Sequence, residues 1–443
     1  MSVFSFSRRS TVPPAPERAA LGVVDPVLVG LVMALMAFGV VMVFSASAVF
    51  ASQTYGDGHR YLIRQAVFAL LGLATMLAVS RVDYHKLRPL TYPAVAATIV
   101  LFVATMIVGR SAGGATRWIR IGPVDIQAAE VAKLTIVLFL AYSLSKKAEQ
   151  MRTFKIGVLP HLIVMSLFAF FCIVQPDLGS AVMIGLITFL MLFLAGARLG
   201  PILGTILGVA VAAVVAIETS DWRRARIEAF LDPFAHRAGS GYQIVESMLA
   251  FGSGGLTGVG IGDSRQKLFF LPEAHTDFIS AIIGEELGFV GMTIVIGAFA
   301  ILVIRGLRTA WNAPDEYGAH LAVGATLLVG LSAFTNLAVA MGALPTKGLV
   351  LPFLSYGGSS LLVDAAAVGV ILNVSRQCVG KRSAVEGPGL SDASRRARAP
   401  RAIGVRAEPE QEASAMRTRR NHVGPASLGT PADGSVREAV GET

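Results

Sequence analysis

Charged residues and cysteines are scarce in this sequence of 443 residues. Charged side chains make up 15% of it, whereas about a quarter of the residues in a soluble domain are charged, so a soluble enzyme is not expected. The two cysteines, Cys172 and Cys378, lie in or beside apolar segments far apart in the chain, and neither a disulfide nor a cysteine-based metal site is expected. No short apolar run near the beginning ends in a small-residue cleavage site, so we expect no removable signal peptide.

The sequence contains long apolar runs. A helix crosses a hydrocarbon core of about 30 Å with roughly 20 residues, and backbone groups in lipid must satisfy one another's hydrogen bonds. We therefore predict an all-α polytopic membrane protein with about ten transmembrane helices and a long extracytoplasmic loop between the seventh and the eighth. The predicted spans are residues 24–50, 62–80, 90–109, 124–145, 156–174, 178–195, 199–217, 276–305, 318–343 and 351–377.

Basic residues in the joints between these spans predict the orientation. An even number of spans puts both termini on one side, and Lys and Arg gather in every second joint, which places those joints and the termini in the cytoplasm. We predict a cytoplasmic N-terminal segment 1–23, a transmembrane domain 24–377 and a disordered, basic cytoplasmic tail 378–443. The net charge of +9 thus follows the membrane topology, and no nucleic acid is expected as a partner.

Two joints on the outward side break the charge rule. The long loop 218–275 carries several basic residues, but long loops cross the membrane whatever their charge. The short joint after the third span carries Arg110, Arg117 and Arg120, which suggests a function for cations on the outer side. Arg117-Trp118 is interpreted either as an anion-binding pair or as an anchor at the membrane interface.

The densest polar stretch, residues 267–278, leads into the eighth predicted span. Asp277 is expected in the first helical turn at the outer interface, with Glu285 and Glu286 deeper in the same helix. Acidic groups at a membrane boundary are costly and are functional candidates by default. On spacing alone, Asp277 is equally well explained as a carboxylate that the helix dipole favours, and His275 as an interfacial hydrogen-bonding residue.

A second polar group precedes and enters the tenth span. The prolines and glycines of Pro345-Thr346-Lys347-Gly348 and Ser355-Tyr356-Gly357-Gly358 predict a broken or re-entrant helix, which is tolerated only where it lines protein or water. Lys347 is interpreted either as a cation facing Asp277 or as a side chain that extends to lipid phosphate. Gln175-Pro176-Asp177, between the fifth and sixth spans, belongs to the site or forms a plain turn. The glycine-rich stretch 252–262 fits no nucleotide-binding spacing.

In this order, these segments resemble the FtsW/RodA family of peptidoglycan glycosyltransferases, over roughly residues 24–377. The matching segments are Gly114-Ala115-Thr116-Arg117-Trp118-Ile119, Gln175-Pro176-Asp177-Leu178-Gly179, Gly241-Tyr242-Gln243, Gln266-Lys267-Leu268, Leu271 to Phe278, Gly284-Glu285-Glu286-Leu287-Gly288, Pro345-Thr346-Lys347-Gly348 and Ser355-Tyr356-Gly357-Gly358-Ser359-Ser360. Pro-Glu-Ala-His-Thr-Asp-Phe and Pro-Thr-Lys-Gly resemble the division branch more than the elongation branch. Where the family commonly has Gln-Pro-Ser-Glu, this chain has Gln127-Ala128-Ala129-Glu130 and so lacks two residues that favour a sharp helix start.

The resemblance implies an inner-membrane enzyme of the division septum. Such an enzyme polymerises lipid II onto an undecaprenyl-linked glycan strand and releases undecaprenyl pyrophosphate. A β-1,4 link made from an α-pyrophosphate donor inverts one carbon, which requires a base on the acceptor hydroxyl and positive charge at the leaving group. The resemblance implies Asp277 as the essential acid, with Glu285 and Lys347 completing the catalytic group. The expected substrate-binding residues are Arg117, Trp118, Gln175, Asp177, Lys267, Glu273, His275 and Ser355.

The resemblance also implies partners, and it leaves competing functions to be weighed. A class B penicillin-binding transpeptidase and other divisome membrane proteins are the expected partners, and a divalent cation (Mg²⁺ or Mn²⁺) is an expected cofactor without identified ligands. A lipid II flippase or transporter would place its essential charges near the bilayer midplane, whereas the charges here crowd the outer surface. A scaffold that only recruits the transpeptidase would leave Asp277 and Lys347 free to vary.

Overall fold

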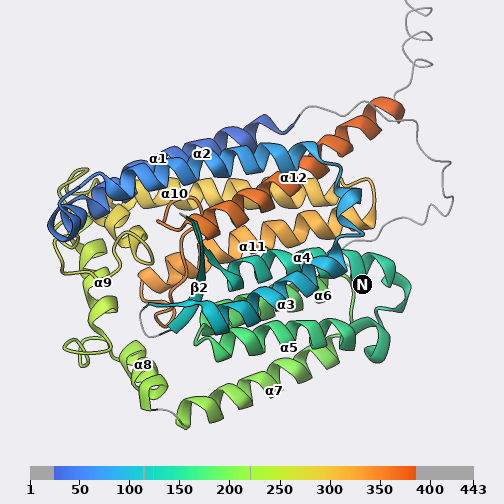
Figure 1. The fold of residues 1–443 in the computed structure, drawn as a ribbon, viewed down its shortest axis with the longest axis horizontal. Helices are drawn as coiled ribbons and strands as arrows, with labels where there is room; N and C mark the ends of the chain where they lie inside the picture. Colours follow the sequence, from blue (N-terminus) through green and yellow to red (C-terminus); the bar gives the residue numbers. More distant parts are fainter. Residues whose placement is uncertain (1–23, 113–114, 123, 220, 386–443) are drawn as a thin grey trace, which may run out of the picture. The chain divides into compact units, whose positions relative to one another are not determined.

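The computed structural model describes residues 24–112, 115–122, 124–219 and 221–385, which form a bundle of helices with a small sheet at one end (Figure 1). The predicted N-terminal segment 1–23 and most of the predicted tail 378–443 lie outside the described residues. The helices are α1 (Pro26–Tyr55), α2 (Arg60–Arg81), α3 (Thr91–Val108), α4 (Ala128–Lys146), α5 (Leu159–Val174), α6 (Leu178–Leu194), α7 (Leu199–Glu218), α8 (Asp221–Leu231), α9 (Tyr242–Gly254), α10 (Ile279–Trp311), α11 (Glu316–Ala340) and α12 (Gly358–Val385). Short helical turns are η1 (Tyr84–Leu87), η2 (Ala148–Gln150) and η3 (Phe154–Val158).

Each predicted span corresponds to one of the helices α1–α7 and α10–α12. By length and composition, eight helices of the described part can cross a membrane, while α6 and the segment Leu199–Val211 of α7 are apolar but shorter. The all-α, multi-pass membrane fold is confirmed, and the number of ten spans stays a prediction. Among the long apolar helices, α4, α11 and α12 are central, with 72%, 78% and 78% of their apolar windows buried.

Several spans begin later than predicted, and for α4 and α10 the structure shows the local reason. The helix α4 begins at Ala128 rather than at residue 124, because Val124–Gln127 forms a strand. The helix α10 begins at Ile279 rather than at residue 276, since the backbone N–H groups of Thr276 and Phe278 both bond to the carbonyl of Glu273 in a turn. The prediction that Asp277 lies in the first helical turn was therefore wrong, because Asp277 precedes the helix.

A three-stranded antiparallel sheet lies at one end of the bundle, hereafter the sheet end. Its strands are β1 (Arg110–Ala112), β2 (Ala115–Ile121) and β3 (Val124–Gln127), with β2 in the middle. The register pairs Trp118 with Gln127 and Arg120 with Asp125, and the Arg120 Nε lies 2.9 Å from the Asp125 Oδ1. The sequence reasoning missed this sheet, which explains how the joint after α3 acquires a fixed shape.

The predicted interruption before α12 is confirmed, because residues 343–357 form no helix and α12 begins only at Gly358. The segment lies against α1, where a Cβ on Gly39 would come within 2.2 Å of the Phe353 carbonyl oxygen, so only glycine allows this approach. Its backbone is satisfied locally: the Leu351 N–H donates to the Ser355 Oγ at 2.8 Å, and Gln65 of α2 donates to the Ser355 carbonyl at 3.2 Å. Irregular backbone is thus buried in protein, as membrane depth requires.

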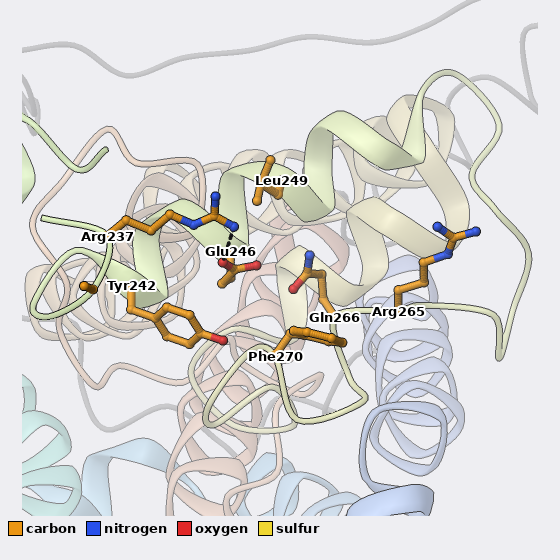
Figure 2. Close-up of a pocket in the computed structure, with 8 residues that line it drawn as sticks. Arg237, Tyr242, Glu246, Leu249, Arg265, Gln266 and Phe270 are labelled. Atoms are coloured by element: carbon orange, nitrogen blue, oxygen red, sulfur yellow. Dashed lines mark hydrogen bonds and ion pairs between the residues drawn. The ribbon is translucent and has the colours of Figure 1, made fainter. Parts of the chain in front are cut away.

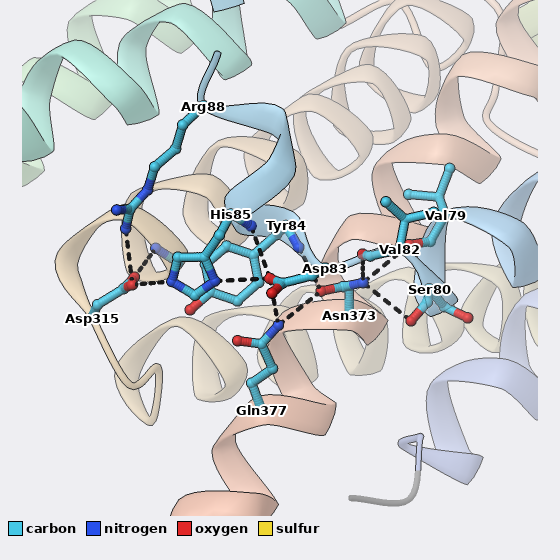
Figure 3. Close-up of polar contacts among 11 residues, drawn as sticks. Val79, Ser80, Val82, Asp83, Tyr84, His85, Arg88, Asp315, Asn373 and Gln377 are labelled. Atoms are coloured by element: carbon cyan, nitrogen blue, oxygen red, sulfur yellow. Dashed lines mark hydrogen bonds and ion pairs between the residues drawn. The ribbon is translucent and has the colours of Figure 1, made fainter. Parts of the chain in front are cut away.

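Polar contacts close the opposite end of the bundle (Figure 3). The His85 ring lies between two carboxylates, with Nε2 2.7 Å from the Asp315 Oδ2 and Nδ1 2.8 Å from the Asp83 Oδ1. The hydrogen bond with Asp315 raises the pKa of His85 above its usual range, although partial burial opposes the shift. Arg88 donates to the same Asp315 oxygen at 3.0 Å. These contacts bring the joints α2–α3 and α10–α11 to one end of the bundle, in agreement with the predicted alternation of joints.

Two adjacent acids of α10 anchor the loop before it. Glu286 is fully buried, and its Oε1 lies 2.9 Å from the Nζ of Lys267. The Ser45 hydroxyl of α1 donates to the same carboxylate at 2.6 Å, while Lys267 also donates to the Gly262 carbonyl at 2.5 Å. Glu285 accepts hydrogen bonds from the Ser264 hydroxyl and from the backbone N–H groups of residues 265 and 266, at 3.1 and 3.3 Å. The loop 262–267 is therefore held from both sides of the helix.

We predict that this buried ion pair behaves as one unit. Lys267→Met or Glu286→Gln alone leaves an uncompensated buried charge and should destabilise the protein by about 3–5 kcal/mol, whereas the double variant should lose much less than the sum. The measurement is the free energy of unfolding of the purified protein in detergent. The control is Arg224→Gln, which breaks an exposed pair with Glu228 and should cost under about 1 kcal/mol. Additive losses in the double variant would contradict the prediction.

Candidate functional site

Asp277 lies in the turn that leads into α10, and the loop after α11 passes directly beside it. A Cβ placed on Gly348 would stand 3.1 Å from the Asp277 Oδ2, so the backbone that carries Lys347 runs against this carboxylate. The absent side chain at Gly348 leaves room for that approach. The loop that carries Lys347 therefore passes beside Asp277, and a shared role for the two residues stays a prediction.

The surroundings of Asp277 favour its protonated form. Burial first, and then the charge of Glu273, raise the pKa of Asp277 to about 7, while Arg117 opposes the shift and Asp177 adds to it. Three other predicted residues, Glu273, Arg117 and Asp177, therefore lie close enough to act on Asp277 electrostatically. A carboxyl group that titrates near neutral pH is suited to take up a proton from a hydroxyl, because the ideal base titrates near the working pH.

Arg117 is positioned by the turn between α5 and α6. It reaches from β2, and its Nε donates to the Gln175 carbonyl at 3.1 Å while its Nη2 donates to the Pro176 carbonyl. Trp118, the next residue of this extended strand, points to the other face of the sheet. Of the predicted pair, only Arg117 is shown to act on Asp277.

Asp177 and Gln175 hold the turn rather than presenting free polar groups. Asp177 is the N-cap of α6, where it accepts hydrogen bonds from the backbone N–H and the hydroxyl of Ser180 at 3.1 and 2.9 Å. The amide of Gln127 also donates to Asp177, at 2.9 Å, and Gln175 donates to the Phe102 carbonyl at 3.2 Å. Of the two interpretations of this segment, the turn accounts for all these contacts, and its effect on Asp277 is electrostatic.

His275 and Ser355 make packing and backbone contacts next to the site. The His275 ring lies among aromatic rings, with centroids 4.7 Å from Tyr61, 5.8 Å from Tyr356 and 5.9 Å from Phe50. Burial lowers the pKa of His275, so this ring stays neutral at pH 7, and its carbonyl accepts a hydrogen bond from the Tyr356 N–H at 2.9 Å. Ser355 is committed to the Leu351 N–H. Both residues fix residues 351–356, the part of the loop between Lys347 and α12.

Lys267 and Glu285 do not share contacts with Asp277. Lys267 is bound by Glu286, Ser45 and the Gly262 carbonyl, so its charge is already neutralised. Glu285 is occupied by the turn at residues 264–266. The geometry does not support the expected roles of Lys267 in substrate binding and of Glu285 in the catalytic group. Both residues hold the loop that leads to Asp277.

Arg226 of α8 is a site residue that the sequence reasoning missed. Its Nη1 donates to the Thr346 carbonyl at 3.4 Å, next to Lys347. Burial and the neighbouring charge of Arg117 lower the pKa of Arg226, and burial lowers the pKa of Lys347. Three cations from three segments are thus linked, because Arg226 lies near Arg117 and contacts the residue next to Lys347, and Arg117 acts on Asp277. The indication in the sequence was the group of three arginines at residues 223–226, whose place in an outward loop was attributed to the length of that loop.

Asn336 of α11 is the second residue that was missed. Its amide Nδ2 donates to the Asp277 carbonyl at 2.8 Å and to the Leu349 carbonyl at 2.6 Å, and the Ser280 hydroxyl donates to its Oδ1 at 3.1 Å. One side chain therefore ties the turn of Asp277 to the loop of Lys347. In the sequence, the indication of a structural or functional role was a single asparagine within an apolar predicted span.

Comparison with known proteins gives a consistent result. The family model for FtsW, RodA and SpoVE, described as "Cell cycle protein", matches residues 26–379. The "Probable peptidoglycan glycosyltransferase FtsW" of Geobacter metallireducens is 44% identical over 358 residues, which cover 80% of this chain and 96% of that protein. The "Stage V sporulation protein E" of Bacillus subtilis is 41% identical over 359 residues, covering 80% of this chain and 97% of that protein.

Solved structures share the fold. A chain of a peptidoglycan synthase complex, described for its coordination of polymerization and crosslinking, superposes with a TM-score of 0.68 at 28% identity, covering 80% of this chain and 98% of that one. The rod shape determining protein RodA of Thermus thermophilus superposes with a TM-score of 0.60 at 28% identity, covering 80% and 97%.

The three cations predict that a polyphosphate anion binds at the sheet end. Inorganic pyrophosphate should raise the midpoint of thermal unfolding of the purified protein, because a ligand that binds only the folded state stabilises it. Arg226→Ala should weaken pyrophosphate binding about tenfold or more, since a hydrogen bond to a charged group contributes about 1.5–3 kcal/mol. Arg224→Ala, on the same helix but paired with Glu228, is the matched control. Equal affinity in both variants would remove Arg226 from the site.

Proposed function

This chain belongs to the FtsW/RodA/SpoVE family of cell cycle proteins, and from that premise we propose that it polymerises lipid II with Asp277 as its base. It is a peptidoglycan glycosyltransferase of cell division and a multi-pass membrane protein. The single observation that carries the catalytic proposal is the Asp277 carboxylate, whose pKa is raised to about 7 where the backbone of the Lys347 loop passes it.

The reaction forms one bond and breaks one. The 4-hydroxyl of the acceptor sugar attacks C1 of the donor, and the bond from C1 to the pyrophosphate oxygen breaks with inversion. The hydroxyl proton passes to Asp277, which must be ionised at that moment. Undecaprenyl pyrophosphate leaves with the electron pair of the broken bond.

The cations at the site stabilise the leaving group. Negative charge develops on the leaving pyrophosphate, and fixed positive groups in a partly dry site stabilise it strongly. Arg117 and Arg226 approach from β2 and α8, and Lys347 approaches from the loop before α12. We assign these three to the pyrophosphate, in place of Lys267.

A divalent cation is not supported as a resident group of the protein. The part of the chain that the structure describes has no group of three or more His, Cys, Asp or Glu residues placed to hold a metal ion. Mg²⁺ commonly binds through one or two carboxylates together with substrate phosphates. We propose that any need for Mg²⁺ or Mn²⁺ arises at the pyrophosphate of the substrate, and no step of the mechanism runs through the ion.

The sheet end is proposed to face outward, with both termini in the cytoplasm at the division septum. Basic joints at the opposite end support this orientation. A class B penicillin-binding transpeptidase is the proposed partner, together with other divisome proteins. A solved relative that belongs to a synthase complex for polymerization and crosslinking supports a partner of this kind.

The deciding experiment is polymerisation of lipid II by the purified protein, with and without its transpeptidase, in EDTA and in Mg²⁺ or Mn²⁺. Asp277→Asn should lower the rate by about 10²–10⁴ or more, the contribution of a positioned base. A folded wild-type protein that makes no strands under any condition would favour a lipid II flippase. Full activity of Asp277→Asn would keep the enzyme and remove Asp277 as its base.

The pH dependence tests the same acid. Because Asp277 titrates near pH 7 and acts as a base in its ionised form, kcat/KM should fall about tenfold per pH unit below about 7 and level off above it. Glu273→Gln removes a negative neighbour, so the pKa of Asp277 should fall and the acidic limb of the profile should move to lower pH. A limb that stays in place would mean that it reports another group.

Asn336 is proposed as a positioning residue for Asp277 and Lys347. Asn336→Leu should lower kcat about 10²-fold, the effect of misplacing a reacting group by about 1 Å, with KM for lipid II little changed. The matched control is Asn373→Leu, which removes an amide that donates to the Val79 and Ser80 carbonyls at the opposite end at 3.1 Å each. It should lower stability without lowering kcat of the folded enzyme. Equal loss of kcat in both variants would make Asn336 merely structural.

A further inference from the structure

A cavity of about 790 Å³, lined by none of the residues of the mechanism above, lies beside the segment that leads to Asp277 (Figure 2). It lies between the beginning of α9 and the segment 265–270. Its volume falls in the range of about 300–1,000 Å³ that is usual for ligand sites. The lining residues that matter here are Arg237, Tyr242, Glu246, Arg265, Gln266 and Phe270.

Both walls of the cavity are fixed by buried groups. On one side, the Glu285 carboxylate holds the backbone of Arg265 and Gln266, as described above. On the other side, α9 is attached to the end of α11, because the Ser247 hydroxyl donates to the Ala340 carbonyl at 2.6 Å. The side chains that face the cavity therefore project from backbone that is already in place, as a binding site requires.

One buried polar atom of the cavity is left for a ligand. The Gln266 Oε1 is buried and accepts no hydrogen bond among the described residues, which is costly unless a ligand supplies a donor. Figure 2 shows the Gln266 amide directed into the space between the Glu246 carboxylate and the Phe270 ring. Glu246 is nearly buried and lies 3.1 Å from the guanidinium of Arg237, while Arg265 is exposed beside Gln266.

This set of groups fits an anionic saccharide. The Phe270 and Tyr242 rings offer flat apolar faces for the C–H side of sugar rings, and the Gln266 amide and the Tyr242 hydroxyl offer hydrogen bonds to hydroxyl and acetamido groups. Guanidinium groups bind carboxylates in a fork geometry, and the two arginines outnumber the one acid. The cavity therefore suits a sugar chain that carries carboxylates, such as a glycan with lactyl and peptide side groups.

We propose that this cavity holds the nascent glycan strand between successive couplings, and the proposal rests on the function assigned above. Phe270 precedes Asp277 by seven residues, which span at most about 25 Å even when fully extended. A strand that leaves the reaction site thus reaches the cavity within a few sugar units. Holding the strand there raises its effective concentration at the site, so that coupling continues instead of releasing a short product.

The test compares strand length with coupling rate in the purified enzyme. Arg265→Ala and Gln266→Ala, each alone and together, should shorten the strands several-fold while the initial rate of lipid II consumption stays within about twofold. Arg224→Ala is the matched control, because this exposed arginine of the same long loop does not line the cavity. Strands of wild-type length in the double variant would overturn the proposal.

A second readout does not depend on catalysis. Lipid-free glycan tetramers with stem peptides should bind the wild-type protein, and Arg265→Ala should weaken that binding about tenfold, as removal of the stem peptides from the probe should. If the wild type made no strands, the assigned function would fail, while this binding comparison would still decide whether the cavity takes saccharides. Equal binding by wild type and variant overturns the site. Loss of transpeptidase binding by the variant, with strand length unchanged in the enzyme alone, would also overturn it and assign the surface to the partner.

Discussion

The site depends on one constraint: backbone that leaves a helix near the membrane must find its hydrogen bonds within the protein. Asn336 meets that need for two segments at once, because its single amide nitrogen donates to the carbonyls of Asp277 and Leu349. Without this bridge, the turn before α10 and the loop before α12 would each carry an unpaired carbonyl. The turn of Asp277 and the loop of Lys347 therefore owe their proximity to a residue that does no chemistry. This also explains why a polar residue is kept inside the best-buried part of the bundle.

The paired acids of α10 solve a related problem for the loop 262–267. Adjacent residues of a helix point about 100° apart, so Glu285 and Glu286 cannot serve one partner. Glu285 binds backbone N–H groups of the loop, and Glu286 binds Lys267 and Ser45. The helix α10 thus binds its own preceding loop through two side chains that point in different directions. These contacts fix both the segment that leads to Asp277 and the segment that lines the proposed saccharide cavity.

Much of this arrangement could be predicted from the sequence, because a membrane restricts where apolar, basic and helix-breaking residues can stand in the chain. Apolar runs gave the helices, alternating basic joints gave the two ends of the bundle, and prolines with paired glycines gave the interruption before α12. The sheet was missed because Ala115–Ile121 is short and is flanked by predicted spans. Partner choice could not be predicted either, since spacing alone does not tell whether Lys267 faces a substrate or Glu286. Lys267 and Glu286 are 19 positions apart, but Ser45, which contacts both, is 222 positions from Lys267 and reaches them only when the bundle closes.

Arginines in joints that are predicted to face outward mark the part of the chain where a function requires positive charge. Positive charge in outward joints works against the predicted orientation of the chain, so a short joint that keeps it needs a compensating reason. In the structure, Arg226 from one such joint contacts the Lys347 loop and lies near Arg117 from the other, and Arg117 acts on Asp277, whose pKa is raised to about 7. A leaving group that carries two phosphates is a sufficient reason, because its negative charge offsets the repulsion between Arg117 and Arg226. Burial first, and then the charge of Arg117, lower the pKa of Arg226, and this cost of a site prepared for pyrophosphate is offset when the substrate binds.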